Sequence, residues 1–239
     1  MKLSAKIGAF FDLDGTLISP PSLEGRFLVH LLSRDEVSSA NLMRWLGHCA
    51  KTILRDRHAA TEGNKLYLAG LRESLVPEWT AAGAPNSPPV FLHGMARLAW
   101  HLAQGHRTFL VTGTLAPLAR AIAQHFPGPL EIIASELEVF DGHWTGRLAG
   151  GHMSGKAKAC AIRALAARYG LQLGQSYAYG NHIADLPMLE AVGNPVAVNP
   201  SSSLARRART RGWPVYKWQE SQAAAQPGAT NALTPREAQ

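Results

Sequence analysis

Short apolar runs alternate with longer stretches of helical periodicity from about residue 90 to residue 218. Each run is only a few residues long and is bounded by turn-forming residues, which is typical of a buried strand. The expected strands lie at 107–111, 130–134, 176–180, 195–199 and 213–218. A β-hairpin is also expected, with Asp141 and Gly142 as its turn. Because strands and helices alternate, the sequence predicts an α/β fold with a Rossmann-like parallel sheet and helices on both faces.

The chain before residue 90 has a different sequence pattern. A buried strand is expected at 7–11, and helical periodicity then runs from Glu24 to Val76, ending in the stretch "GNKLYLAGLRESL" at 63–75. The three prolines of "APNSPP" at 84–89 predict a linker. At the other end of the chain, residues 219–239 have no periodicity and few large apolar residues, which predicts a disordered tail.

The composition indicates a folded, basic protein. Hydrophobic residues make up 46% of the chain, so a substantial core is expected. The net charge of +7 favours anionic partners such as phosphorylated metabolites and leaves open peripheral contact with an anionic membrane surface. The arginines Arg206, Arg207, Arg209 and Arg211 are interpreted as the solvated face of a helix, because no aromatic residue is interleaved with them. No nucleic acid is expected as a partner, and no obligatory protein partner is inferred.

The cysteines and the N-terminal sequence indicate the cellular compartment in which the protein is expected. Cys49 and Cys160 are far apart and match no metal-binding spacing, which indicates a reducing compartment without a disulfide framework. Asp12 interrupts the N-terminal apolar run before a signal-type segment forms, and no apolar run approaches the about 18 residues needed to span a bilayer. We expect a cytoplasmic protein.

Two carboxylates follow the first expected strand. Asp12 and Asp14 are succeeded by Gly15 and Thr16, in the sequence "FFDLDGT". A turn alone explains Asp-Gly, but it explains Asp12 less well, because Asp12 comes before the turn residues. Ligands of open parallel sheets bind beyond the carboxyl ends of the strands. Later strands bring further polar residues to that edge, namely Thr112, Asn181 and Asn199.

Four motifs together resemble the haloacid dehalogenase-like (HAD) superfamily. They are "FFDLDGT", "FLVTGT", "GKAK" and "YGNHIADLPML", in this order along the chain. The nearest branch is that of the phosphoserine-phosphatase-like hydrolases, which carry a helical cap inserted between the first two motifs. The resemblance implies an α/β phosphatase core at 1–18 and 90–218, and a helical cap at 19–89.

The resemblance also implies a reaction. Asp12 would be the nucleophile that forms an aspartyl-phosphate, and Asp14 would protonate the leaving oxygen and then activate water. The cofactor would be Mg²⁺, held by Asp12 and by the backbone carbonyl of Asp14. Thr112 and Gly113 would bind the phosphoryl group, and the free N–H groups of Gly15 and of Gly113, near a helix start, could add to the cradle.

The lysine of the site must be chosen between Lys156 and Lys158. Both open the helix after Gly155, and helix geometry places them on different faces. The branch often shows Gly-Glu-x-Lys here, which favours Lys158 as the phosphate-binding lysine. Lys156 remains the alternative.

The last motif departs from the family pattern. Asn181 stands where the family usually has a metal-binding Asp, whereas Asp185 is retained four residues later. An amide oxygen can coordinate Mg²⁺ without bringing charge, and Asp185 can act through water or by orienting Asn181. We expect weakened metal binding. The alternative is a catalytically impaired protein of the same fold that binds a phosphate ligand without turnover.

The substrate is expected to be a small-molecule or lipid phosphate monoester. In capped members of the superfamily the cap selects the leaving group, so cap residues are candidate contacts. These are Glu24, Arg26, Asn64, Lys65 and Tyr67, and His182 is a further candidate beside the last motif. Each of them is also compatible with a surface or packing role.

Overall fold

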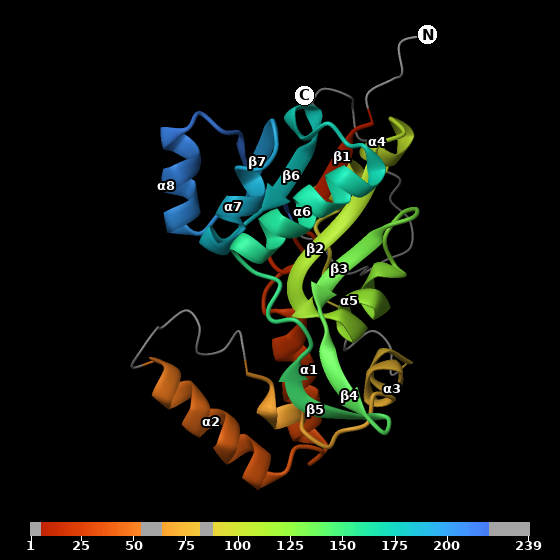
Figure 1. Cartoon of the computed structure of the whole chain (residues 1–239), viewed down its shortest axis with the longest axis vertical. Coiled ribbons are helices and arrows are strands. Elements are labelled where there is room, and N and C mark those ends of the chain that lie inside the picture. The colour runs from red at the N-terminus through yellow and green to blue at the C-terminus, as the bar shows by residue number, and fades with distance from the viewer. Residues whose placement is uncertain (1–5, 54–63, 82–87, 220–239) are drawn as a thin grey trace, which may run out of the picture.

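A parallel sheet forms the centre of the computed structural model, which describes residues 6–53, 64–81 and 88–219 (Figure 1). Six strands of the described residues are ordered β3-β2-β1-β6-β7-β8. They are β1 (Gly8–Phe11), β2 (Arg107–Leu115), β3 (Glu131–Ser135), β6 (Tyr177–Gly180), β7 (Asn194–Val198) and β8 (Val215–Tyr216). The predicted α/β class with a Rossmann-like parallel core is confirmed.

Helices cover both faces of this sheet, because successive side chains of a buried strand point to opposite sides. Phe10 of β1 belongs to a core shared with α6 (Lys156–Tyr169), α7 (Leu186–Leu189) and α8 (Ser202–Thr210). Its neighbour Phe11 belongs to the opposite core, which includes residues of α4 (Leu92–Ala103) and α5 (Ala116–Ala123). Phe11 also stacks on Tyr179 of β6, with ring centroids 4.5 Å apart. Apolar packing on both faces therefore holds β1 in the middle of the sheet.

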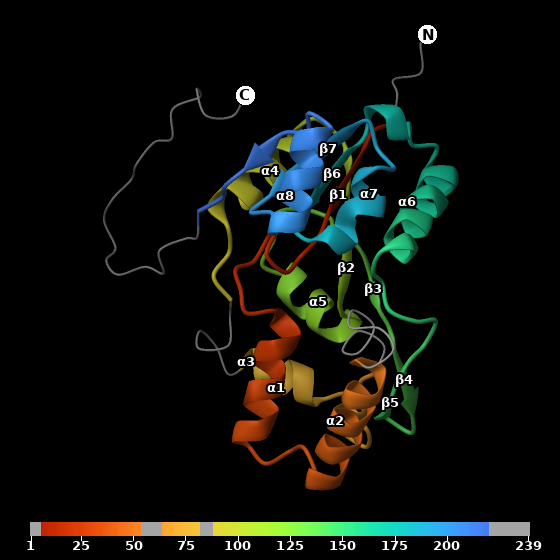
Figure 2. The same ribbon diagram turned by 90° about the vertical axis from the view of Figure 1, so that its left-hand side faces the viewer.

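The end of the molecule away from the sheet is mainly helical. Figures 1 and 2 show it to contain α1 (Leu23–Ser33), α2 (Ser39–Ile53), α3 (Leu75–Ala81) and a hairpin of β4 (Leu137–Phe140) and β5 (His143–Leu148). We call this part the helical end. Its core holds Phe27 of α1, whose ring centroid lies 5.3 Å from that of Trp79 and 6.3 Å from that of Trp144. No helix of the described residues is long and apolar enough to cross a bilayer.

The hairpin has the predicted turn, but its backbone pairing with residues 65–73 was not predicted. Asp141 and Gly142 both have positive φ, of 48° and 71°. Within the stretch 63–75, expected to be helical, residues 64–74 form only a 3₁₀ turn, η1 (Leu66–Leu68), while Gly63 lies outside the described residues and Leu75 begins α3. Its backbone hydrogen-bonds to the hairpin instead, from Gly70 N to Trp144 O at 2.8 Å and from Trp144 N to Leu71 O at 2.9 Å. The helical prediction for this stretch was wrong because its amides pair with a strand that is remote in sequence.

The two chain segments that join the sheet to the helical end run side by side. Ser19 N donates to Pro89 O and Phe91 N donates to Leu17 O, each at 2.9 Å. The expected boundaries at 18/19 and 89/90 fall at this crossing. Most of the expected linker at 84–89, and the expected tail apart from Gln219, lie outside the described residues.

Candidate active site

A cavity of about 500 Å³ opens at the carboxyl ends of the strands and extends to the helical end. The sheet, its loops and α6 line it with Asp12, Asp14, Thr112, Gly113, Thr114, Lys158, Asn181, His182 and Asp185. The predicted catalytic, phosphate-binding and metal-binding residues thus line one cavity, although they come from four separate parts of the chain.

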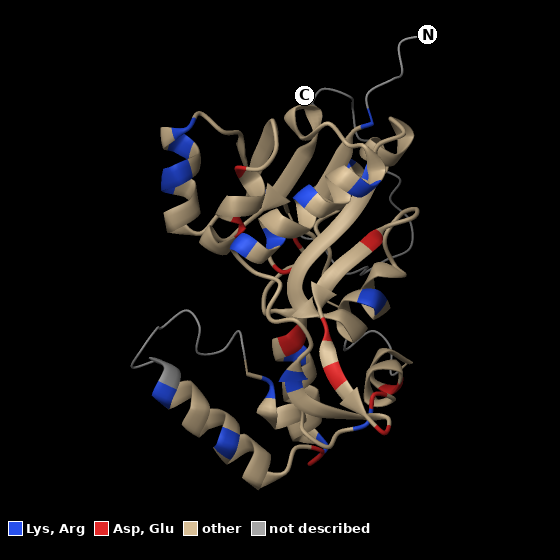
Figure 3. Cartoon of the chain, viewed as in Figure 1, with Lys and Arg blue, Asp and Glu red and all other residues tan. Residues whose placement is uncertain are grey.

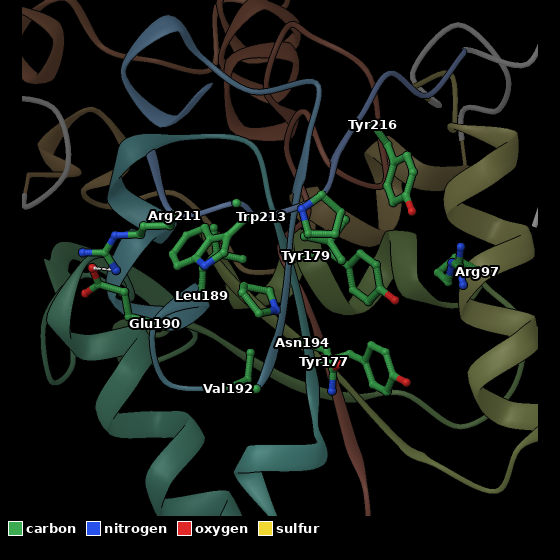
Figure 4. A pocket seen from close by; sticks show the side chains of 15 residues that line it. Arg97, Tyr177, Tyr179, Leu189, Glu190, Val192, Asn194, Arg211, Trp213 and Tyr216 are labelled. Atoms are coloured by element: carbon green, nitrogen blue, oxygen red, sulfur yellow. Dashed lines mark ion pairs between the residues drawn. The ribbon is translucent and has the colours of Figure 1, made fainter. Parts of the chain in front are cut away.

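A larger cavity, of about 730 Å³, lies where β6 and β7 begin, at the opposite edge of the sheet (Figure 4). Tyr177, Tyr179 and Trp213 are among its walls. The one carboxylate among the described residues that line it is Glu190, and this forms an ion pair with Arg211 at 2.5 Å. No lysine lines this cavity in the described part of the chain. The residues that phosphoryl transfer needs are therefore in the smaller cavity.

Asp12 is held rigidly at the end of β1. Its N–H donates to Tyr179 O at 3.0 Å, which continues the parallel pairing of β1 with β6. Its carboxylate accepts from Lys158 Nζ at 2.6 Å through Oδ1 and from Thr16 Oγ1 at 3.4 Å through Oδ2. Only 6% of the residue is exposed. The carboxylate is consequently fixed at the floor of the cavity.

Lys158 is the lysine that reaches this carboxylate. It is buried in the first turn of α6, and its Nζ also lies 2.6 Å from Asp185 Oδ1. Lys156 begins the same helix but is exposed. Burial lowers the pKa of Lys158, but Asp12 and Asp185 more than offset this, so its pKa lies above the ordinary value. The ammonium therefore stays charged at neutral pH.

Carboxyl groups outnumber ammonium groups at the cavity floor. Burial raises the pKa of Asp12 to about 7, and the neighbouring Asp185 adds to this increase while Lys158 opposes it. Asp14 contributes a third carboxyl group, and burial raises its pKa as well. One ammonium thus faces three carboxyl groups, and a bound cation would relieve the imbalance.

Asp14 connects the sheet to the helical end. Its Oδ1 accepts from Leu23 N, the first residue of α1, at 2.7 Å. Its Oδ2 accepts from Thr114 Oγ1 at 2.5 Å. Thr114 is a site residue that the sequence interpretation missed, although it is the second threonine of "FLVTGT". Both oxygens of Asp14 are therefore oriented by groups from outside the first motif.

The expected phosphate cradle is only partly available. Gly15 has φ +80°, and its N–H donates to Ile18 O at 2.7 Å within the turn, so the expectation that this N–H is free was wrong. Gly113 lies inside β2, which continues to Leu115, and α5 begins directly afterwards at Ala116. The Thr112 hydroxyl lies 3.1 Å from Thr114 Oγ1 and is buried beside the carboxylates.

Asp185 organises the loop after β6. Its Oδ2 accepts from the backbone N–H groups of Asn181, at 3.1 Å, and of His182, at 3.0 Å. The Asn181 side chain lies against the first-motif turn, since a Cβ on Gly15 would come within 2.0 Å of Asn181 Nδ2. Glycine at position 15 therefore leaves the room that the Asn181 amide occupies.

The oxygen donors around this turn fit Mg²⁺. They are the Asp12 carboxylate, the Asp14 backbone carbonyl and the Asn181 amide, all hard oxygen groups of the kind that Mg²⁺ prefers. Among the described residues, no group of three or more His, Cys, Asp or Glu side chains could hold a metal ion. A cation here would accordingly depend on neutral oxygens beside the one direct carboxylate.

The helical end supplies the wall that faces these residues. Glu24 Oε1 accepts from both Lys65 Nζ and Tyr67 OH at 2.6 Å, and all three residues line the cavity. His152, which was not predicted, lines the cavity next to Gly113. Burial, with Lys65 nearby, lowers the pKa of His152 to about 4, so this imidazole is neutral at pH 7.

Three residues singled out in the sequence do not line the cavity. The Arg26 guanidinium donates to the carbonyls of the two prolines before α1, and Asn64 Oδ1 accepts from Leu66 N. Asn199 instead exchanges hydrogen bonds with the Trp218 backbone. Arg26 and Asn64 therefore have the packing role that was the alternative for them, and Asn199 follows β7 at the expected edge without reaching the cavity.

The family profile described as haloacid dehalogenase-like hydrolase matches residues 9–190. The chain belongs to this family. A Mycobacterium tuberculosis protein named phosphoserine phosphatase SerB1 is 33% identical to this HAD hydrolase over 237 residues, covering 94% of the chain and 75% of the relative. A Bordetella pertussis protein of unknown function has a crystal structure with a TM-score of 0.72 at 29% identity, covering 89% of the chain and 98% of that structure.

The fold extends to more distant structures. The structure of a phospho-aspartyl intermediate analogue of phosphoserine phosphatase has a TM-score of 0.61 at 17% identity, covering 85% of this chain and 91% of that chain. The resemblance to HAD hydrolases of the phosphoserine-phosphatase-like branch, drawn from four short motifs, is confirmed.

Proposed function

We propose that this HAD hydrolase is a Mg²⁺-dependent phosphatase that hydrolyses a phosphate monoester through a phosphorylated Asp12. One observation carries the proposal: the buried Asp12 carboxylate is held by Lys158 at the floor of a cavity, beside the separately anchored carboxyl group of Asp14. The names of relatives, among them phosphoserine phosphatase, support phosphate ester chemistry.

The reaction divides into two transfers. An oxygen of Asp12 attacks phosphorus, the bond from phosphorus to the leaving oxygen breaks, and Asp14 gives its proton to that oxygen. Asp14 then takes a proton from a water molecule, whose oxygen attacks phosphorus and releases Asp12. A pKa of Asp14 raised by burial suits a group that must both donate and accept a proton.

The surrounding residues bind and orient the phosphoryl group. The Lys158 ammonium offsets the negative charge of the phosphoryl oxygens, and the Thr112 hydroxyl donates a hydrogen bond to one of them. Asp185 positions both Lys158 and the backbone of Asn181. Asp12, the Asp14 carbonyl and Asn181 would hold Mg²⁺. When bound, the metal ion would neutralise charge on the phosphoryl oxygens.

The helical end is proposed to act as the cap that selects the leaving group. We place residues 19–89 in this cap, and we add the hairpin β4–β5 because its backbone pairs with residues 65–73. The Glu24, Lys65 and Tyr67 side chains face the cavity from this side, which suits a polar leaving group on a small-molecule or lipid phosphate monoester. The wide separation of Cys49 and Cys160 in the sequence, which indicates a reducing compartment, is consistent with a cytoplasmic location.

The decisive experiment is phosphate release from an aryl phosphate with Mg²⁺ and with a chelator. The proposal predicts turnover that stops when the metal ion is removed and returns when it is restored. The alternative, a phosphate-binding protein impaired by Asn181, predicts calorimetric binding of inorganic phosphate without turnover at any Mg²⁺ concentration. That second result would replace the phosphatase proposal with the binding protein.

A further inference from the structure

Helix α2 exposes large apolar side chains on its outer side. Met43 is 67% exposed and Leu46 is 46% exposed, whereas Cys49 on the inner side is buried. Met43, Leu46, Gly47 and Ala50 follow the three- and four-residue spacing that places residues on one side of a helix. An apolar strip that faces water is unfavourable, so it is a candidate contact surface.

Basic residues form a second strip beside the apolar one. Arg44 and Lys51 are both exposed and are two helical turns apart. The helix, with the sequence SANLMRWLGHCAKTI, has no Asp or Glu. Figure 3 accordingly shows Lys and Arg on α2 and no acidic residue. The outer side of α2 therefore combines apolar and cationic groups without any compensating negative charge.

We propose that the outer side of α2 is a docking surface for an anionic lipid bilayer. Met43 and Leu46 would enter the boundary between headgroups and acyl chains, and Arg44 and Lys51 would contact lipid phosphates. This combination of an apolar face with flanking cations is what an interfacial amphipathic helix requires. The net charge of +7 adds long-range attraction to the same surface.

The charge pattern favours a lipid surface over a second copy of the chain. A symmetric dimer through α2 would place the same basic strip on both sides of the contact. Arg44 and Lys51 of one copy would then face those of the other with no acidic residue of α2 between them. An anionic membrane instead satisfies the apolar and the cationic strips together.

Docking through α2 would bring the catalytic cavity close to the bilayer. Trp45 of α2 lines the cavity and packs against Tyr67, with ring centroids 5.3 Å apart. An α-helix with its side chains is about 10–12 Å across. The cavity wall formed by α2 would therefore lie about one helix diameter from the lipid surface.

Vesicle flotation of the full chain tests this inference. The vesicles contain phosphatidylcholine alone, or phosphatidylcholine mixed with phosphatidylglycerol, and no substrate is present, so the outcome does not depend on the proposed function. We expect binding to the mixed vesicles only. The double variant Met43→Ser/Leu46→Ser should abolish this binding, and Arg44→Gln/Lys51→Gln should weaken it about thirty-fold.

A matched control distinguishes binding through the outer side of α2 from attraction by the overall positive charge of the protein. Arg206→Gln/Arg207→Gln removes the same charge from exposed positions of α8 and should retain nearly all the binding. Absence of binding to the mixed vesicles, or an equal loss in the α8 variant, would overturn the proposal. So would a wild-type dimer that dissociates in the Met43→Ser/Leu46→Ser variant, because the occupant of the strip would then be a second copy.

Discussion

Lys158 Nζ lies 2.6 Å from Asp12 Oδ1, although the two residues are 146 positions apart in the sequence. The contact exists because α6 packs on the face of the sheet that contains Phe10, while Asp12 follows β1 directly. The same ammonium lies 2.6 Å from Asp185 Oδ1. Lys158 thus connects three motifs of the family through one buried charge.

Lys158→Met should cost both stability and activity. Removal of the ammonium leaves Asp12 and Asp185 buried without their cation, and breaking a buried ion pair costs about 3–5 kcal/mol. Urea unfolding and phosphate release measure the two effects. The exposed neighbour offers a matched control, since Lys156→Met should change the free energy of unfolding by less than about 0.5 kcal/mol. Loss of activity in the Lys156 variant alone would contradict the assignment of Lys158.

Asn181→Asp should strengthen Mg²⁺ binding. The substitution adds a negative charge next to the first-motif turn, and repulsion from Asp12 and desolvation offset most of the Coulomb gain. A gain of about tenfold in metal affinity is expected. Titration of turnover with Mg²⁺ should show higher activity at limiting metal and little change at saturation. An unchanged Mg²⁺ dependence would mean that Asn181 is not a ligand.

A buried histidine should make stability depend on pH. His101 Nδ1 lies 2.8 Å from His106 Nδ1, and His101 Nε2 lies 2.8 Å from the Tyr179 hydroxyl. Burial, with His106 and Arg97 nearby, lowers the pKa of His101 to about 3 from its ordinary 6.5. As the pH falls from 6.5 towards 3, His101 becomes protonated in the unfolded chain but stays neutral in the folded chain. The neutral His101 therefore leaves the free energy of unfolding at its full value above pH 6.5. That free energy decreases as the pH falls from 6.5 towards 3.

His101→Gln should flatten this dependence. The slope of the free energy of unfolding between pH 6 and pH 4 should decrease by up to about 1.4 kcal/mol per pH unit, the value for one proton. Comparison of slopes removes the constant cost of replacing a buried side chain. Urea unfolding at several pH values measures the slope for the wild type and for the variant. Equal slopes in the two proteins would show that His101 titrates normally.

The sequence predicted the sheet edge well, because strand ends and motif residues are local features. Asp12, Lys158 and Asp185 each follow or adjoin a segment whose periodicity is readable, and a parallel sheet gathers such residues at one edge. The departure from the family pattern at Asn181 is also visible in the sequence alone. A motif cannot show the direction of each side chain, so the sequence could not decide whether Arg26, Asn64 and Asn199 reach the cavity.

The failures concern contacts between distant segments. Residues 63–75 have apolar spacing compatible with a helix, but the backbone of residues 65–73 pairs with the hairpin β4–β5, which is remote in the sequence. Thr114 was passed over because the strand was expected to end at residue 111, whereas β2 continues to Leu115 and Thr114 donates to Asp14. The Gly15 N–H was assigned to a ligand although the turn itself uses it. Each of these outcomes depends on tertiary partners that local propensity does not encode.

Replacement of Asp12 by asparagine tests the central claim most directly. Asp12→Asn keeps nearly the same size and removes the nucleophile, and the free energy of unfolding serves as the control for folding. The measurement is phosphate release from an aryl phosphate at saturating Mg²⁺, for the wild-type protein and the variant at matched purity. The account predicts turnover by the wild type and none above background in a folded variant. A variant that retains activity within a few-fold of the wild type would contradict it.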